Sequence, residues 1–298
     1  MKKAKFGFIR DHAGEHGVGA MCRALGVTRQ GHYQWLSRPK SAHDGRDGEL
    51  AAMVAEEFEG SRRIYGAPKI LMRLRARGER TSKKRVARIM REMGIRGVTR
   101  ACSKRPSGEK RASKRDSADD LVKRDFSADG PNRAWLADIT YVRTHQGWLY
   151  LAVVMDIWSR MVVGWSMGPE ITAALADDAL KMAIRRRRPP KGCVHHTDHG
   201  SQYTSLLLGK TMRDSGIRPS MGSVSSPWDN APTESLMGII KSECVHARTF
   251  DSREQAAMEI FDYIETFYNR VRIHSAIEWM SPTEFERTHS KGAAQKAA

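Results

Sequence analysis

Hydrophobic residues recur at helical spacing in the first part of the chain. Between residues 16 and 37 they flank a break at Gly26, Val27 and Thr28, which predicts two short helices joined by a turn. Thr28 suits the N-cap of the second helix, because its hydroxyl can accept a hydrogen bond from a nearby backbone N–H. Polar residues of that helix could face a DNA groove, and a helical hairpin with a purely structural role is an equally good interpretation. They are Arg29, Gln30, His32 and Gln34.

Residues 49–93 repeat the helical spacing among many basic residues. Pro68 suits the first turn of a helix, and Gly94 stands where a helix commonly ends. Thr81 and Ser82 can cap a helix that ends before Gly94. We expect the basic residues of that helix to bind DNA. They are Lys83, Lys84, Arg85, Arg88 and Arg91.

After Pro131 the spacing changes from helical to alternating. The pattern predicts a meander of three strands, then two shorter strands with helices between and after them. The predicted strands are residues 135–144, 148–156, 161–167, 193–197 and 217–221, and the predicted helices are 171–187, 203–215, 232–243 and 253–268. The fold class is therefore an α/β domain preceded by an all-α, helix-turn-helix-like basic region.

A stretch with few hydrophobic residues separates the two patterns. Residues 96–125 are rich in Lys, Arg, Ser and Asp, a composition typical of a flexible basic linker. We expect a domain boundary near residue 125. The predicted domains are a helix-turn-helix-like region at 1–48, a basic helical DNA-binding region and linker at 49–125, an α/β domain with C-terminal helices at 126–288, and a tail at 289–298.

Charge is unevenly distributed along the 298 residues. The formal net charge is +17, from 51 Lys and Arg against 34 Asp and Glu. Residues 60–115 contain 20 of the basic residues and three acids, whereas the rest of the chain is balanced. Such a module favours a polyanionic partner, with a plain solvated surface as the alternative. We therefore expect nucleic acid as the partner.

Hydropathy and cysteine usage exclude several classes of protein. No run approaches the roughly 18 apolar residues that a membrane span needs, and the N-terminus has no secretory signal pattern. We expect a cytoplasmic protein without membrane contact. The four cysteines lie far apart, which argues against a disulfide framework or a cysteine zinc site.

Three acidic residues stand in settings that suit chemistry. Asp138 interrupts a run of strand-forming residues, where a carboxylate is costly to bury unpaired. Asp198 follows a predicted strand beside a glycine turn, where α/β sheets commonly hold ligands. Glu234 lies in the first turn of a predicted helix, where its charge also suits the helix dipole. Taken singly, each residue has a structural interpretation too.

Together, the three carboxylates indicate metal chemistry on nucleic acid. Two acids on a sheet and one on a helix can converge on two divalent cations, because Mg²⁺ prefers oxygen ligands and uses few protein carboxylates plus substrate phosphates. Such a pair of ions activates a water or a 3′ hydroxyl and stabilises the departing oxygen. The expected reaction is phosphoryl transfer on DNA.

The spacing of these acids carries a family resemblance. Fifty-nine residues separate Asp138 from Asp198, and 35 separate Asp198 from Glu234, which resembles the DD(35)E signature of transposases and retroviral integrases. The surrounding segments resemble the second-frame product of the bacterial insertion-sequence family three, over nearly the whole chain. They are WLADITY at 135–141, DIWSR at 156–160, HTDHGSQY at 196–203, DNAPTES at 229–235, and the closing residues Tyr268, Asn269, Arg272, His274, Ser275, Ser281 and Pro282.

This resemblance implies a ribonuclease-H-like integrase catalytic core at 126–288. The implied enzyme uses two Mg²⁺ or Mn²⁺ ions to cleave DNA at the ends of an insertion sequence and to join those ends to target DNA. Asp138, Asp198 and Glu234 would be its metal ligands and catalytic residues. The resemblance also implies a homo-oligomer in the DNA complex and an upstream first-frame product as a fusion partner made by frameshifting.

Other charged residues near the triad leave alternatives open. Asp156 and Asp229 could be mistaken for ligands, but the 35-residue spacing favours Glu234, and Asp229 suits a helix cap. Lys241 lies seven residues after Glu234, two helical turns along, and could contact the DNA backbone or be an ordinary solvated lysine. The run of arginines at 185–188 suits a helix C-terminus and could also meet DNA.

Three histidines surround Asp198 in the sequence. His195, His196 and His199 could bind zinc in principle, but the first two are adjacent and point to opposite sides of a strand. We expect these histidines to orient the carboxylate or to contact phosphate.

Three functions remain to be compared. A transposase would use the basic helical half to bind element ends and the α/β domain for metal-assisted strand transfer. A DNA-binding regulator or inhibitor of transposition would lack independent catalysis, and a metal nuclease of the ribonuclease H kind would hydrolyse without joining strands. The intact triad favours an enzyme over a regulator, and the long basic half favours the transposase over the nuclease.

Overall fold

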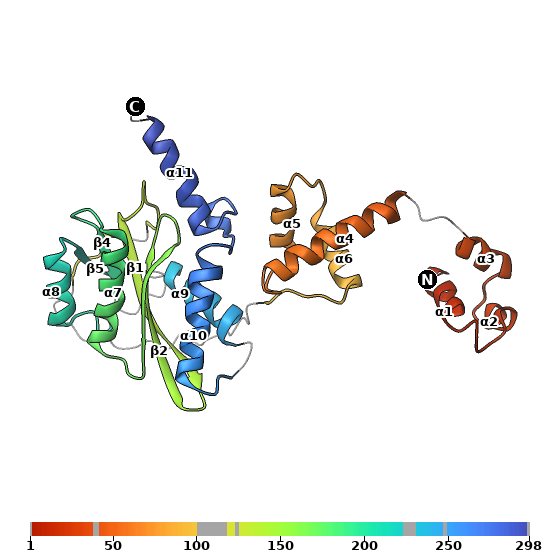
Figure 1. Ribbon diagram of the computed structural model, residues 1–298, viewed down its shortest axis with the longest axis horizontal. Helices are drawn as coiled ribbons and strands as arrows, with labels where there is room; N and C mark the ends of the chain where they lie inside the picture. The colour runs from red at the N-terminus through yellow and green to blue at the C-terminus, as the bar shows by residue number, and fades with distance from the viewer. Residues whose placement is uncertain are drawn as a thin grey trace. The chain divides into compact units, whose positions relative to one another are not determined.

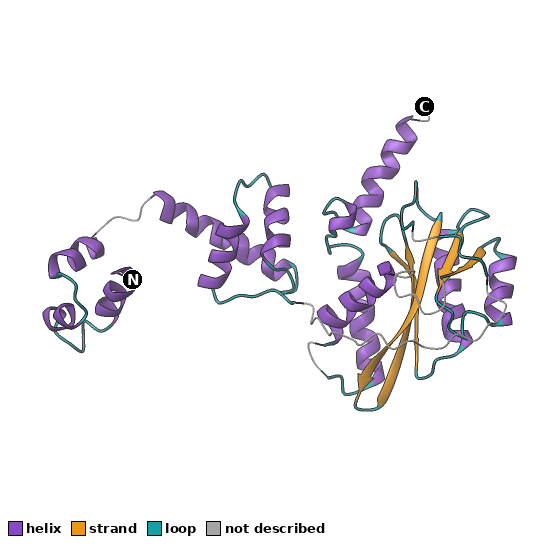
Figure 2. Cartoon of the chain, turned by 180° about the vertical axis from the view of Figure 1, so that it is seen from behind, coloured by secondary structure: helices purple, strands orange, loops and turns teal. Residues whose placement is uncertain are grey.

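The computed structural model describes residues 2–37, 42–99, 118–122, 125–222, 231–246 and 249–296. The chain divides into two compact units, Met1–Glu56 and Glu57–Ala298, which are described separately. Within the described residues, the first unit contains helices and no strand, and the second contains helices and one sheet (Figure 1; Figure 2). No helix in the described part of the chain is long and apolar enough to span a membrane.

The first unit consists of α1 (Lys2–Asp11), α2 (Val18–Ala24), α3 (Arg29–Ser37) and most of α4 (Ala42–Gly60). Helices α2 and α3 confirm the predicted helix, turn and helix. The N–H of Gly31 donates to Thr28 Oγ1 at 3.1 Å, so Thr28 caps α3 as expected. The sequence pattern did not predict α1, whose Ile9 completes a small core with Met21 and Cys22.

The faces of α3 differ from those predicted. His32, expected among the residues facing a DNA groove, is buried, and its ring centroid lies 5.9 Å from that of Phe6 on α1. Tyr33 and Leu36 are about half exposed, although their spacing predicts a core position. The reason is that α1 packs against α3 and selects which side of this helix is buried. Arg29 remains exposed, in agreement with the prediction.

Helices α5 (Ala67–Ala76) and α6 (Lys83–Glu92) pack against each other at the start of the second unit. Pro68 lies in the first turn of α5, and Gly94 follows α6 with a φ of +67°, as the pattern predicts. Ser82 caps α6, because its Oγ accepts a hydrogen bond from the N–H of Arg85 at 3.2 Å. The pair buries an apolar face from each helix: Ile70, Leu71, Leu74, Val86, Ile89 and Met90.

A five-stranded sheet forms the centre of the second unit. Its strands are β1 (Ala134–Thr144), β2 (Gly147–Asp156), β3 (Val162–Gly168), β4 (Val194–Thr197) and β5 (Arg218–Met221), in the order β3-β2-β1-β4-β5. The first three strands pair antiparallel, whereas β4 and β5 pair parallel on the other side of β1. All five predicted strands are confirmed, and the order is the ribonuclease-H-like arrangement implied by the family resemblance.

One face of the sheet carries α7 (Ala173–Arg187) and α8 (Leu206–Asp214) (Figure 1). Because side chains alternate along β1, Trp135 and Ala137 share this face and are buried in its core. Gly164 on β3 lets α7 approach closely, since a Cβ there would lie 2.2 Å from the carbonyl oxygen of Ala179. The close approach explains the glycine in an otherwise apolar strand.

The opposite face carries α9 (Ala231–Ile240) against β1 and α10 (Arg253–Asp262) against β2. Both helices continue as π-helices, η2 (Lys241–Val245) and η3 (Tyr263–Tyr268), where the sequence predicts uninterrupted α-helices. The chain ends in the 3₁₀ turn η4 (Ser275–Ile277) and α11 (Pro282–Lys296), a helix that continues through most of the predicted tail. Hydrophobic spacing cannot distinguish a π-turn from an α-turn, because both present apolar residues to the core.

The described end of the predicted linker packs on the sheet. The N–H of Leu121 donates to Ser220 Oγ on β5 at 2.9 Å, and Val122 is buried. This part of the predicted linker is therefore attached to the sheet edge before the predicted boundary near residue 125. Residues 100–117 lie outside the described residues.

Candidate active site

Asp138 lies on the face of β1 that α9 covers. It shares this face with Leu136 and Thr140, because successive side chains of a strand point to opposite sides. The carboxylate is partly buried, and its Oδ1 accepts a hydrogen bond from the N–H of Ile139 at 2.8 Å. Within the described part of the chain no basic side chain forms an ion pair with Asp138.

Asp198 stands beside Asp138 because of the strand register. Leu136 on β1 pairs with His196 on β4, and each aspartate lies two residues beyond that pair. Parallel strands lie about 4.8 Å apart, so the register brings the two acids to neighbouring positions at the carboxyl end of β4. Asp198 is exposed, and its Oδ1 accepts a hydrogen bond from the N–H of Gly200 at 3.0 Å.

Gly200 lets the chain turn closely around this carboxylate. A Cβ at Gly200 would lie 3.1 Å from Asp198 Oδ1 and 2.8 Å from Gln202 Oε1. A side chain at this position would therefore displace the two side-chain oxygens. The glycine of the HTDHGSQY segment thus has a local structural reason.

Glu234 lies in the first turn of α9 and is exposed. The next turns of the helix are anchored, because Leu236, Met237 and Ile240 are buried. Helix α9 packs against β1, so Glu234 is presented at the sheet face that holds Asp138. The predicted capping residues Asp229 and Asn230 lie outside the described residues.

The negative charges of Asp198 and Glu234 both act on the carboxylate of Asp138. Burial raises the pKa of Asp138, the negative charge of Asp198 raises it further, and Glu234 adds to the effect, so the pKa reaches about 7. The N–H of Ile139 and the charge of Lys241 oppose this shift but do not cancel it. The structure therefore brings the three predicted acids within electrostatic reach of one another and leaves their repulsion uncompensated.

Tyr203 is a residue of this site to which the sequence analysis gave no role. Its side chain is 4% exposed, and its hydroxyl has no hydrogen-bond partner among the described residues. Burial raises the pKa of Tyr203 well above its usual range, and the charges of Asp138 and Asp198 add to this effect. The hydroxyl therefore keeps its proton and remains a donor near the two carboxylates. Its place five residues after Asp198 is the sequence signal that could have identified it.

Lys241 begins the π-helix that follows α9. Its Nζ lies 4.5 Å from the centre of the Tyr141 ring, and its charge lowers the pKa of Asp138. The lysine therefore stands beside the acidic site, where a phosphate could contact it. Its predicted contact with DNA stays a prediction.

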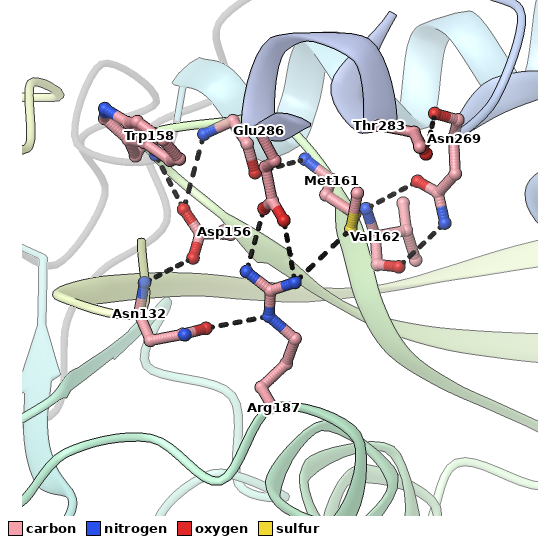
Figure 3. A network of polar contacts seen from close by, with 10 residues as sticks. Asn132, Asp156, Trp158, Met161, Val162, Arg187, Asn269, Thr283 and Glu286 are labelled. Atoms are coloured by element: carbon pink, nitrogen blue, oxygen red, sulfur yellow. Dashed lines mark hydrogen bonds and ion pairs between the residues drawn. The ribbon is translucent and has the colours of Figure 1, made fainter. Parts of the chain in front are cut away.

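Asp156 has a structural role in the fold. Its Oδ2 accepts a hydrogen bond from the N–H of Asn132 at 2.7 Å, and its Oδ1 accepts one from the N–H of Trp158 at 2.9 Å (Figure 3). The side chain is fully buried. Asp156 therefore holds the turn after β2 and is not available to a metal at the site of Asp138, which supports the choice made from the spacing.

Two members of the arginine run are also used within the fold. Arg187 forms two hydrogen bonds with the carboxylate of Glu286 on α11 and a third with Asn132 Oδ1 (Figure 3). Arg186 pairs with Glu265 at 2.7 Å. These arginines join α7 to the C-terminal helices. The predicted contact of the arginine run with DNA stays a prediction.

Two of the histidines around Asp198 are buried in the sheet. His195 is 2% and His196 1% exposed, and His196 Nδ1 lies 2.9 Å from Ser220 Oγ. Burial, together with a smaller contribution from the neighbouring His196, lowers the pKa of His195 to about 4. Its ring is therefore neutral near pH 7. The expectation that these two histidines contact phosphate is therefore wrong, because both rings are buried. The alternative, that they orient the carboxylate, stays a prediction.

The predicted DNA-binding residues of α6 are largely on its surface. Lys83, Lys84 and Arg91 are exposed, whereas Arg85 and Arg88 are partly buried. Arg88 also forms an ion pair with Glu92 at 3.0 Å. The exposed positions of this helix are the ones that suit contact with phosphates, and their role in binding stays a prediction.

The donor set of the acidic site suits a hard divalent cation. All three carboxylates offer oxygen ligands, and Tyr203 adds a buried hydroxyl without a partner. Among the described residues no three His, Cys, Asp or Glu side chains are already gathered closely enough to hold a metal ion. Asp198 and Glu234 are exposed, so a cation that binds at Asp138 would be accessible to both carboxylates from solvent.

The sequence matches three known domain families. Residues 45–101 match a family described as an HTH-like domain, and residues 128–227 match the integrase core domain. A second integrase core domain family matches residues 234–289. The match at 45–101 covers most of α4 and all of α5 and α6. The match at 128–227 covers the sheet with α7 and α8, and the match at 234–289 covers most of α9 and the helices that follow it.

Whole-chain relatives extend these matches. The chain is 42% identical over 284 residues to the transposase InsF for insertion sequence IS3A of Escherichia coli (strain K12). The aligned region covers 95% of this chain and 98% of that protein. It is 34% identical over 277 residues to the insertion element IS600 uncharacterized 31 kDa protein of Shigella sonnei, which covers 92% of this chain and all of that protein.

Solved structures give weaker likenesses. The simian T-cell lymphotropic virus intasome in complex with the PP2A regulatory subunit B56 gamma aligns with a TM-score of 0.46 at 15% identity, over 78% of this chain and 74% of that chain. The HTLV-2 integrase catalytic core domain in complex with magnesium, in its trimeric form, aligns with a TM-score of 0.42 at 18% identity, over 53% of this chain and 98% of that chain.

Proposed function

Because the chain belongs to the family of insertion-sequence transposases with an integrase core domain, we propose that Asp138, Asp198 and Glu234 are its metal ligands for DNA cleavage and strand transfer. The observation that carries this proposal is the meeting of three carboxylate charges from β1, the end of β4 and α9, without an ion-pairing cation among the described residues. Such repulsion is relieved when a divalent cation binds between the acids.

The residues of the site would divide the work between them. Asp138 would hold metal from the sheet, Asp198 from the turn after β4, and Glu234 from the first turn of its helix. Two bound Mg²⁺ or Mn²⁺ ions would activate a water or a 3′ hydroxyl on one side of a phosphodiester and stabilise the departing oxygen on the other. Tyr203 would donate its hydrogen bond to a carboxylate oxygen and so orient it, and Lys241 would contact a phosphate of the bound strand.

The remaining parts of the proposal concern partners. We propose that α6 binds phosphates of double-stranded DNA at element ends, and that Arg29, Gln30 and Gln34 on α3 reach a groove. A homo-oligomer would bring two ends together, in the bacterial cytoplasm. An upstream first-frame product would supply further DNA binding when fused to this chain.

The test is strand cleavage and joining on labelled DNA that carries the element's own ends. Wild type should act only with Mg²⁺ or Mn²⁺, and Glu234→Gln should be inactive. The matched control is Glu254→Gln, because Glu254 also lies exposed in the first turn of a helix, α10. If the wild type binds this DNA but does not cleave it, either alone or when fused to its upstream product, the result would favour the DNA-binding regulator over the transposase. Equal loss of activity in Glu254→Gln would contradict the assignment of Glu234.

A further inference from the structure

Two large aromatic side chains lie exposed on the β1–β2 hairpin. Tyr141 is 46% exposed and Trp148 is 43% exposed, and their ring centroids lie 5.2 Å apart in an edge-to-face arrangement. Tyr141 continues the face of β1 on which Trp135 and Ala137 are buried in the core. The face of β1 that is buried at Trp135 and Ala137 is therefore open to solvent at Tyr141, where the aromatic pair lies.

Cations flank this aromatic pair. Lys241 Nζ lies 4.5 Å from the centre of the Tyr141 ring, and the exposed Arg143 is the direct cross-strand neighbour of Trp148. The hairpin is held in place from α10, because Arg253 Nε donates to the carbonyl oxygen of Trp148 at 2.9 Å. An exposed ring pair beside positive charge is chemically suited to a nucleotide, whose base can stack while its phosphate meets the cation.

The pair is also close to the acidic site. Tyr141 follows Asp138 by three residues on β1, a distance of about 10 Å along the strand, and the two side chains point to opposite faces of the sheet. Lys241 connects the two places, because it contacts the Tyr141 ring and its charge also reaches Asp138. Described residues of β4 pair with β1 only as far as Leu136, so no described strand lies along the β4 side of β1 at Tyr141.

We infer that Tyr141 and Trp148 form a stacking site for an unpaired base of the DNA strand whose phosphate lies at the carboxylates. The inference rests on the proposed function and deepens it, since it assigns a binding place for the substrate beside the reacting phosphodiester. Stacking on aromatic rings tolerates any base, so the site would favour frayed or single-stranded ends over closed duplex without reading a sequence. A protein partner would need a larger apolar surface than two side chains provide.

The experiment compares two fluorescein-labelled DNA probes without divalent metal, using the full chain. One probe is a duplex with a short single-stranded thymidine extension, and the other is the blunt duplex of the same sequence. Tyr141→Thr and Trp148→Thr remove the rings but keep strand propensity. Each should weaken binding of the extended probe about tenfold, as expected from stacking of one base, and leave binding of the blunt probe unchanged.

Matched variants make this result specific. Trp148→Phe and Tyr141→Phe keep a ring and should retain the preference for the extended probe. Phe261→Ala removes an aromatic side chain of similar exposure, 47%, on α10, and should change binding to neither probe. The inference is overturned if the Thr variants keep the preference, or if they weaken both probes equally. Because no metal is present, these outcomes do not depend on whether the three acids are catalytic.

Discussion

Two glutamates on one continuous helical segment have opposite surroundings. Glu234, at the start of α9, is exposed and adds its negative charge to those of Asp138 and Asp198. Glu243, in the π-helix η2, has a side chain only 9% exposed and accepts hydrogen bonds from Arg272, with Nε to Oε2 at 2.8 Å. Burial acts to raise the pKa of Glu243, but the bonds and charge of Arg272 lower it overall.

The difference shows that one fold can use a carboxylate either for a structural ion pair or for a candidate metal site. At Glu243 every charge has a partner inside the protein, since Arg272 and Lys69 supply cations and Tyr263 donates its hydroxyl at 2.7 Å. At Asp138 the described residues supply two further carboxylates and no ion pair. Compensated charge indicates structure, whereas uncompensated charge indicates a place for an external cation.

The buried cluster, which we define as Glu243, Arg272, Lys69 and Tyr263, also joins α5 to the core. Lys69 on α5 reaches Glu243, and the hydroxyl of Tyr65 accepts from the N–H of Ile273 at 2.8 Å and donates to the carbonyl of Val271 at 3.2 Å. Burial lowers the pKa of Lys69 to about 8, with Arg272 adding to the effect against the opposing charge of Glu243. Segments far apart in sequence therefore share one buried network.

The largest expected effect comes from removing a charge at the acidic site. Asp138→Asn should abolish strand cleavage, because the site then has one metal ligand fewer. The same change removes a repelled, partly buried charge, so the thermal midpoint without metal should stay equal or rise. Wild type should gain stability on addition of Mg²⁺, and Asp138→Asn should gain less. Thermal unfolding with and without Mg²⁺ measures this, and an unchanged Mg²⁺ response would remove Asp138 from the metal site.

Breaking the buried cluster should instead reduce stability. Arg272→Met leaves Glu243 buried without its main partner, which costs about 3–5 kcal/mol of unfolding free energy. Urea unfolding measures the loss, and adding Glu243→Gln to Arg272→Met should recover part of it. Arg63→Met is the control, because the Arg63–Glu59 pair is exposed and its loss should be barely measurable. Additive losses in the double variant would contradict the coupling.

Exposed cations provide the third contrast. Unlike Arg272, the side chains of Lys83, Lys84 and Arg91 are at the surface, where phosphates can reach them. Replacing all three by Gln should reduce the slope of log affinity against log salt by about 0.9 for each phosphate that the protein no longer neutralises. The control is Lys210→Gln on α8, another exposed lysine, which should keep the slope. An unchanged slope in the triple variant would exclude α6 from phosphate contact.

The smallest expected effect is a pH dependence of stability. Folding raises the pKa of Asp138 from 3.8 to about 7, so the folded state binds this proton more tightly than the unfolded chain. Its contribution to stability is therefore most favourable below pH 3.8 and falls as the pH rises toward 7. The stability of Asp138→Asn relative to wild type should increase across this interval. Thermal unfolding of both proteins without metal tests it, and parallel pH profiles would contradict the raised pKa.

Much of the architecture was predictable from spacing alone. Runs of strand-forming residues bounded by turns predicted all five strands after Pro131, because such runs are encoded locally in each strand. The caps at Thr28 and Ser82 were predictable for the same reason, since a cap needs only its own residue and the next turn. The helix α1 escaped prediction, and with it the burial of His32, because the side of a short helix that is covered depends on what packs against it.

The sequence by itself determined the order of the elements and the three acids that stand in the family spacing. The tertiary structure decided which charges meet. Strand register places Asp198 beside Asp138, and helix packing presents Glu234 to the same face. The packing of separate segments brings Arg272 and Lys69 to Glu243. Periodicity describes a residue's own element, whereas electrostatic repulsion and compensation depend on distances between elements, which only the folded chain fixes.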